Sequence, residues 1–99
     1  MSAPLSIEGE LTVFTVHALK DRMMAALAQS SALQVDLSEV SEVDGAGIQL
    51  LLAAKREAQQ RGGTLSLIGQ PPQFIAALEL TDLASEFGAP PIHDLETTA

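Results

Sequence analysis

Hydrophobic and polar residues alternate over residues 33–37, LQVDL, so that the apolar side chains would share one face of a strand. The same alternation recurs over residues 64–68. Near the start of the chain, Gly9 separates two short apolar stretches, residues 5–7 and 11–13, which favours two short strands or one bent strand. These segments predict the strands of one sheet.

Between the strands, apolar residues recur every three or four positions, as on one face of a helix. Helices are predicted over residues 15–29 and 45–61, and a third, short helix begins at Pro72. A glycine pair after the second helix is a typical C-terminal stop signal. The apolar face of the first helix consists of Leu19, Met23, Ala26 and Leu27.

The order of strands and helices predicts an α/β fold: a single small domain with a four- to five-stranded mixed sheet and covering helices. We expect the strands at 33–37 and 64–68 to be adjacent and parallel, joined by a right-handed crossover through the 45–61 helix. The domain should cover residues 1–88, and residues 89–99 should form a flexible tail.

The junction between the central strand and the second helix carries the candidate site. Asp44 is a good N-cap, because its short carboxylate can accept hydrogen bonds from the first N–H groups of the helix. Gly45, Ala46 and Gly47 follow, so little side-chain bulk covers the unpaired donors and positive dipole of the helix start. Asp36 and Asp44 would both lie near the exit of the central strand. This arrangement predicts a docking edge and not a catalytic centre.

The second helix has more apolar residues than one face can hold. Leu51, Ala54 and Ala58 form one stripe. We predict that Ile48 and Leu52, on another side, are partly exposed and available to a partner; the alternative is that they pack under the N-terminal strands. The predicted docking residues are Asp44, Gly45, Ala46, Gly47, Ile48, Gln49 and Leu52.

Three pieces of sequence stand in a recognisable order. They are Gly9-Glu10-Leu11 before a threonine-capped helix, then Asp36-Leu37-Ser38 with Val40, Val43 and Asp44-Gly45-Ala46-Gly47, and finally Gly62-Gly63-Thr64-Leu65-Ser66-Leu67. Together they resemble the STAS domain family, which includes the bacterial anti-sigma factor antagonists and carries a D-L-S and a D-S-S-G or D-T-A-G motif. The resemblance covers about residues 5–88. It implies a STAS fold and a docking role in signalling and transcription regulation.

The resemblance also implies a phosphorylation switch that this chain lacks. In the antagonists, the partner kinase phosphorylates a serine or threonine in the first turn of the second helix. The matching positions here are Gly45 and Ala46, with Ala46 in place of the family's serine, and neither residue has a hydroxyl group. We expect no phosphorylation there, and Ser38 and Ser41 are the nearest substitutes. The resemblance therefore predicts the family's docking surface for this chain, but not the family's phosphorylation switch.

Composition narrows the function classes further. The net charge is −8, and the five basic residues are too few and too dispersed for a stripe that follows nucleic-acid phosphates. The chain has no cysteine, which excludes disulfides and thiolate chemistry. No apolar run approaches the ~20 residues that span a bilayer, and no secretory signal is recognisable. We expect a cytoplasmic protein that neither binds nucleic acid nor inserts into a membrane.

The sequence does not support a catalytic or metal site. Asp36, Glu39, Glu42 and Asp44 are acidic, but hard cations need a convergent set of oxygen ligands, which this spacing does not indicate. A serine nucleophile needs a neighbouring base, and His17 is distant in sequence from the serines near the site. We therefore expect no enzyme activity, no metal and no cofactor.

Two hypotheses about function remain. In the first, the chain is a regulatory docking domain that binds an anti-sigma factor or kinase-like protein, or that works in another bacterial system such as a chemotaxis-type phosphorelay. In the second, it is a small accessory subunit bound to the ATPase of a phospholipid ABC transporter, a role known for STAS proteins of the D-T-A-G type. Small-ligand binding between sheet and helices has no support in the sequence. Neighbouring genes would discriminate: a kinase or sigma factor favours the first hypothesis, a transporter ATPase and permease the second.

Overall fold

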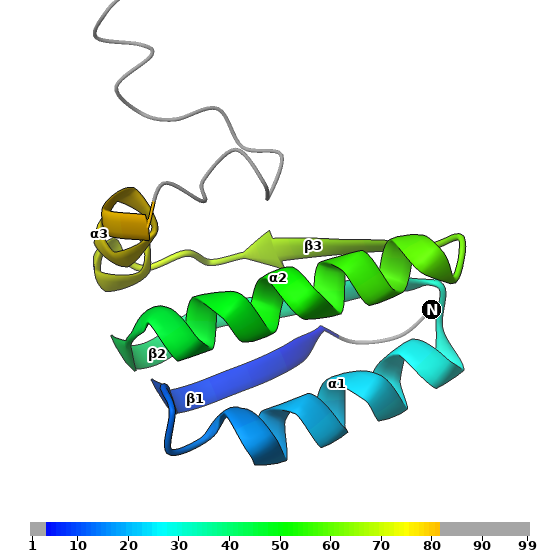
Figure 1. The fold of residues 1–99 in the computed structure, drawn as a ribbon, viewed down its shortest axis with the longest axis horizontal. Helices are drawn as coiled ribbons and strands as arrows, with labels where there is room; N and C mark the ends of the chain where they lie inside the picture. Colours follow the sequence, from blue (N-terminus) through cyan, green and yellow to red (C-terminus); the bar gives the residue numbers. More distant parts are fainter. Residues whose placement is uncertain (1–3, 82–99) are drawn as a thin grey trace, which may run out of the picture.

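The computed structural model describes residues 4–81, which form alternating strands and helices (Figure 1). The elements are β1 (Leu5–Leu11), α1 (Val16–Gln29), β2 (Ala32–Val43), α2 (Gly45–Gln60), β3 (Thr64–Ile68) and α3 (Pro72–Thr81). This confirms the predicted α/β class. The predicted tail at residues 89–99 lies outside the described residues.

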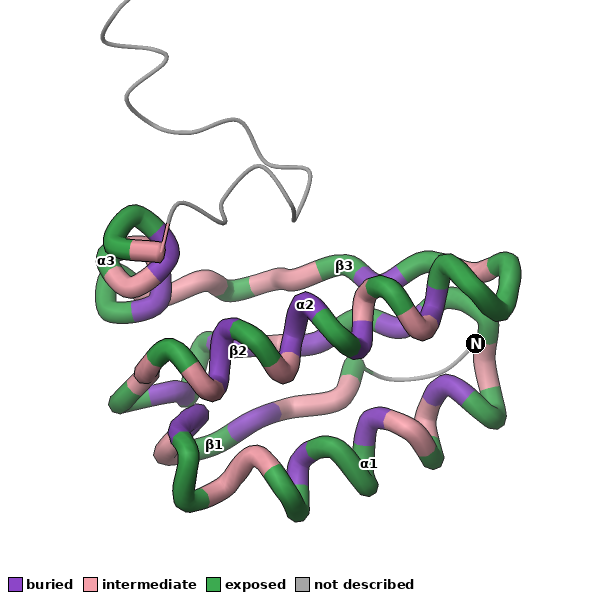
Figure 2. Tube along the Cα trace, in the orientation of Figure 1, coloured by how far each residue is buried: buried purple, intermediate pink, exposed green. Residues whose placement is uncertain are grey.

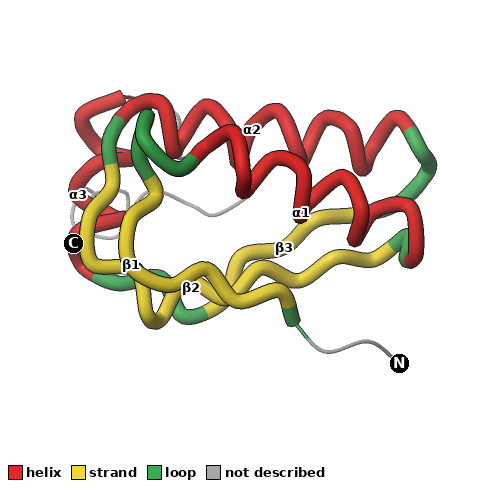
Figure 3. Tube along the Cα trace, turned by 90° about the horizontal axis from the view of Figure 1, so that it is seen from below, coloured by secondary structure: helices red, strands yellow, loops and turns green. Residues whose placement is uncertain are grey.

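The strands form one sheet in the order β1-β2-β3, and both neighbouring pairs are parallel. The predicted pairing of the second and third strands is confirmed, with Leu33 opposite Leu65 and Val35 opposite Leu67. Both connections move the chain in the same direction across the sheet. Two crossovers of the same hand therefore place α1 and α2 on the same face, as Figure 3 shows.

The sheet has three strands that are all parallel, so the expectation of a four- to five-stranded mixed sheet is wrong for the described residues. The segment around Gly9 was predicted to be two short strands or one bent strand, and the second alternative holds, which lowers the strand count. Gly9 adopts a positive φ of 78° and accompanies a register shift, but β1 continues through it to Leu11. Val13 lies beyond the strand.

The central strand β2 is longer than predicted. The polar stretch of residues 38–43, expected to be a connector, continues the strand because β1 pairs with it as far as Leu11 opposite Val43. Asp36 therefore lies inside β2, opposite Ser6 and Ile68, and not at the strand exit. Of these two aspartates, only Asp44 follows the carboxyl end of β2.

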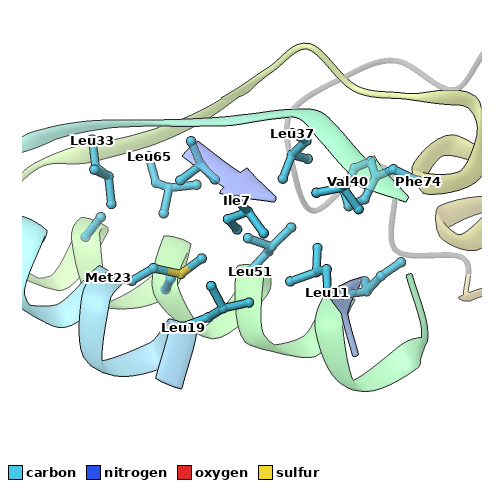
Figure 4. Packing of buried hydrophobic residues seen from close by; sticks show 14 of the residues in the cluster. Ile7, Leu11, Leu19, Met23, Leu33, Leu37, Val40, Leu51, Leu65 and Phe74 are labelled. Carbon is cyan, nitrogen blue, oxygen red and sulfur yellow. The ribbon is translucent and has the colours of Figure 1, made fainter. Parts of the chain in front are cut away.

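The core lies between the sheet and its covering helices and is almost entirely aliphatic. Figure 2 shows buried segments recurring along α1 and α2, and Figure 4 shows Leu19, Met23 and Leu51 from these helices facing leucines of the sheet. Phe74 of α3 is fully buried beside Val40, so α3 closes the core at the carboxyl end of β2. Among residues 4–81, no helix is both long and apolar enough to cross a membrane.

The helices begin close to the predicted residues, but the predicted side-chain cap of α1 by Thr15 is wrong. α1 begins after Thr15, although the Thr15 hydroxyl donates to the Glu10 carbonyl oxygen at 2.9 Å and makes no cap bond. α2 begins after Asp44 and ends at Gln60, and the predicted glycine signal follows at Gly62, whose φ is 79°. Pro72 is the first residue of α3, as predicted.

Candidate functional site

Asp44 joins three elements at the carboxyl ends of β1 and β2. Its Oδ1 accepts a hydrogen bond from the Gly47 N–H at 3.0 Å, which caps α2, and its Oδ2 accepts one from the Val13 N–H at 3.0 Å. The Asp44 N–H donates to the Leu11 carbonyl oxygen at 3.2 Å. One aspartate therefore fixes the start of α2 to β1 and to the β1–α1 loop, residues 12–15.

These donors favour the ionised carboxylate. The Val13 N–H contributes most and the Gly47 N–H next in holding the pKa of Asp44 below its ordinary value of 3.8. The pKa of Asp36 is also lowered, chiefly because the Ser38 N–H donates to its Oδ1 at 2.9 Å. Both side chains are therefore charged at neutral pH.

Acidification is expected to destabilise the domain through Asp44. Because the folded pKa lies below the unfolded value of 3.8, the stabilisation is complete above that value and is lost as the pH falls through the folded pKa. Asp44→Asn keeps a capping oxygen but not the charge. We expect the urea midpoint, followed by circular dichroism, to fall between about pH 5 and pH 3 by less in this variant than in wild type. Identical pH dependences would contradict a role for the Asp44 charge.

The first turn of α2 is only partly open to a partner. Gly45 and Gln49 are exposed and Ala46 is half-buried, so backbone lies near the surface here with little side-chain cover. Gly47 is buried, and a Cβ added to it would overlap the Leu11 carbonyl oxygen. Of the glycines in this turn, Gly45 leaves a surface free, whereas Gly47 allows α2 to pack against β1.

The expectation that Ile48 and Leu52 are partly exposed is wrong. Their side chains are 0% and 3% exposed, and Ile48 belongs to the main core. The helix α2 contacts the sheet beneath it, α1 on one side and α3 on the other, so apolar residues are buried around most of its circumference. Both side chains are therefore buried inside the domain, as the alternative of packing under the N-terminal strands required, and neither can form an exposed patch.

The structure adds two residues that the sequence analysis missed. Val13 and Phe14 are 60% and 88% exposed at the tip of the β1–α1 loop. The Val13–Asp44 hydrogen bond places this loop beside the start of α2. The alternation over residues 11–13 had placed Val13 in a strand, whereas Phe14 follows it directly and fits no alternating pattern, which was the available signal.

Nearly the whole chain, and not this edge alone, matches a known protein family. A family model described as Mlab, STAS domain matches residues 2–89. The chain belongs to the STAS domain family. This confirms the resemblance seen in the sequence motifs.

Relatives of this STAS domain include anti-sigma factor antagonists. It is 24% identical over 79 residues to an anti-sigma-B factor antagonist of Bacillus subtilis, covering 80% of this chain and 72% of that protein. It is 27% identical over 79 residues to an anti-sigma-B factor antagonist of Listeria monocytogenes, covering 79% and 69%. The solved structure of the anti-sigma factor antagonist SpoIIAA in its unphosphorylated form gives a TM-score of 0.68 at 20% identity, over 86% of this chain and 79% of that one. This structural likeness shows that the fold is shared.

Ser38 and Ser41, the nearest substitutes for the missing phosphorylation site, lie in β2 and not in the first turn of α2. Ser38 and Ser41 are both exposed within β2, and the Ser41 hydroxyl donates to the Gly9 carbonyl oxygen at 3.2 Å. Across residues 4–81, no three acidic or histidine side chains converge as a metal site would require.

Proposed function

We propose that this STAS domain is a non-enzymatic docking module that binds a bacterial regulatory protein of the anti-sigma factor class in the cytoplasm. The observation that supports this most is the start of α2, where Asp44 fixes a turn with exposed Gly45 and half-buried Ala46 beside the exposed β1–α1 loop. The names of the sequence relatives point to the same class of partner.

The absence of a hydroxyl at Gly45 and Ala46 determines how such binding would be regulated. A kinase cannot phosphorylate either residue, so docking at this turn is constitutive or is controlled by the state of the partner. The role proposed for Gly45, Ala46 and Gln49 is direct contact, whereas Asp44 and Gly47 position the turn.

We expect Ala46→Asp to weaken binding of the source organism's anti-sigma factor by at least about tenfold, because a charged side chain would be buried where the partner meets the backbone. The carboxylate also imitates, imperfectly, the phosphorylated state of the family. The fold should survive, since an acidic residue in the first turn favours the helix dipole. Isothermal titration calorimetry with the purified anti-sigma factor measures the change.

The matched control is Ala53→Asp, which places the same substitution on the exposed side of α2 two turns from its start. It should bind like wild type. Equal binding by the Ala46 and Ala53 variants would place the docking surface elsewhere.

A second candidate is the accessory subunit of a phospholipid transporter ATPase. The supporting observation is that Ala46 and Gly47 match the last two residues of the D-T-A-G motif, with Gly45 in place of threonine. Isothermal titration calorimetry with the organism's transporter ATPase discriminates the two candidate functions. A docking module specific for the anti-sigma factor should not bind the ATPase, whereas an accessory subunit should.

A further inference from the structure

Phe14 is exposed to an unusual degree for an aromatic residue. Its side chain is 88% exposed and the neighbouring Val13 is 60% exposed, so two adjacent apolar side chains project from the β1–α1 loop. Aromatic side chains are the commonest anchors at protein interfaces, because they bury a large area at a small cost in conformational entropy.

The loop that carries Phe14 is held by hydrogen bonds. The backbone N–H groups of three consecutive residues each donate to a side-chain oxygen: Thr12 to Thr15 Oγ1 at 3.1 Å, Val13 to Asp44 Oδ2 at 3.0 Å, and Phe14 to Thr12 Oγ1 at 3.3 Å. Thr12 itself is buried. A fixed loop that holds apolar side chains in water loses little further freedom when it binds, which favours affinity.

The strands β1 and β2, which precede this loop and α2, carry two cross-strand pairs of acidic residues. Glu8 is opposite Glu39 and Glu10 is opposite Glu42 in the β1–β2 register. Like charges on neighbouring strands are mutually destabilising, so the sheet itself gains nothing from them. Glu10 connects the pairs to the loop, because its Oε1 accepts a hydrogen bond from the Thr12 hydroxyl at 2.9 Å.

The occupant of this surface must match both features. The carboxylates do not converge on a point within the described residues, so a single metal ion does not fit. None of the five basic residues lies in the loop or in the first two turns of α2. Positive charges spread over a protein surface are therefore the complement that the two acidic pairs favour.

We propose that Val13 and Phe14 anchor this domain in an apolar pocket of its protein partner, and that lysine or arginine side chains at the rim of that pocket face the glutamate pairs. The proposal rests on the proposed function and adds to it a second contact region, made of the β1–α1 loop and the glutamate pairs of β1 and β2. It assigns most of the binding energy to Phe14 and the salt dependence to the glutamates.

The apolar part is tested with the purified anti-sigma factor and the transporter ATPase as partners. Phe14→Ser should weaken binding to whichever partner the wild type binds by at least about tenfold, with an unchanged circular dichroism spectrum. Leu80→Ser is the matched control, because Leu80 on α3 is also 88% exposed, and its binding should equal that of wild type.

The charge part uses the double variant Glu39→Gln with Glu42→Gln, measured at two salt concentrations. Its affinity should be lower than that of wild type and should depend less on salt, whereas Asp21→Asn, on the exposed side of α1, should change neither.

Each outcome decides the proposal. If Phe14→Ser binds within twofold of wild type while Ala46→Asp is impaired, the proposed function stands and the Phe14 anchor is overturned. If the glutamate variant keeps the wild-type salt dependence, the basic rim is overturned. If wild type binds neither partner, the proposed function fails, and the anchor fails with it.

Discussion

Replacing Ile48 by aspartate is expected to unfold the domain. The side chain is 0% exposed and lies in the main core. Its removal forfeits about 2–5 kcal/mol of apolar burial and packing, and a carboxylate placed there loses its hydration without gaining a partner. Small domains are stable by only about 5–15 kcal/mol, so most molecules should lose their helical circular dichroism at 25 °C.

The control for Ile48→Asp is Gln49→Asp, which introduces the same charge at the next residue. Gln49 is exposed, and the variant should remain folded at a cost of about 0.5 kcal/mol in helix propensity. A folded Ile48→Asp protein with impaired partner binding would instead show that Ile48 is a surface residue, as the sequence pattern had indicated.

Gly47→Ala is expected to be the other severe substitution. A Cβ at this position would overlap the Leu11 carbonyl oxygen and lie 2.7 Å from Leu11 Cγ, and a strand backbone cannot move away cheaply. We expect a loss of about 3 kcal/mol in the free energy of unfolding, measured by urea denaturation. The cause is displacement of the start of α2 from β1.

The matched control is Gly45→Ala, two residues earlier in the same helix. An added Cβ at Gly45 meets nothing within 4 Å, and alanine is a better helix former by about 1 kcal/mol. The two substitutions should therefore shift stability in opposite directions. A neutral Gly47→Ala would mean that α2 and β1 do not approach as closely as described.

Sequence patterns predicted the elements whose signals are local. The Asp44 cap, the glycine stop after α2 and Pro72 at the start of α3 depend on residues within one helical turn, and the structure has all three. The parallel pairing of β2 and β3 was predicted from the alternating pattern of each strand and from the rule for strand–helix–strand crossovers. Both signals lie within a single strand–helix–strand unit.

The features that could not be predicted depend on contacts between distant segments. Residues 38–43 have no apolar alternation, yet they form a strand because β1 supplies partners for their backbone groups. Ile48 and Leu52 were assigned to a surface because the periodicity of one helix does not reveal that other elements flank it on both sides. The exposure of Phe14 depends likewise on a loop geometry set by Asp44, 30 residues further along the chain.

The all-parallel arrangement of the described sheet also affects how the chain folds. Parallel neighbours cannot be joined by a tight hairpin, so β1 reaches β2 only across α1, and β2 reaches β3 only across α2. Every strand pairing must therefore overcome the entropy of closing a long loop before it gains a hydrogen bond. Helical contacts are local and carry no such cost. During synthesis on the ribosome, β2 emerges without its β3 edge partner until α2 and its glycine stop have followed.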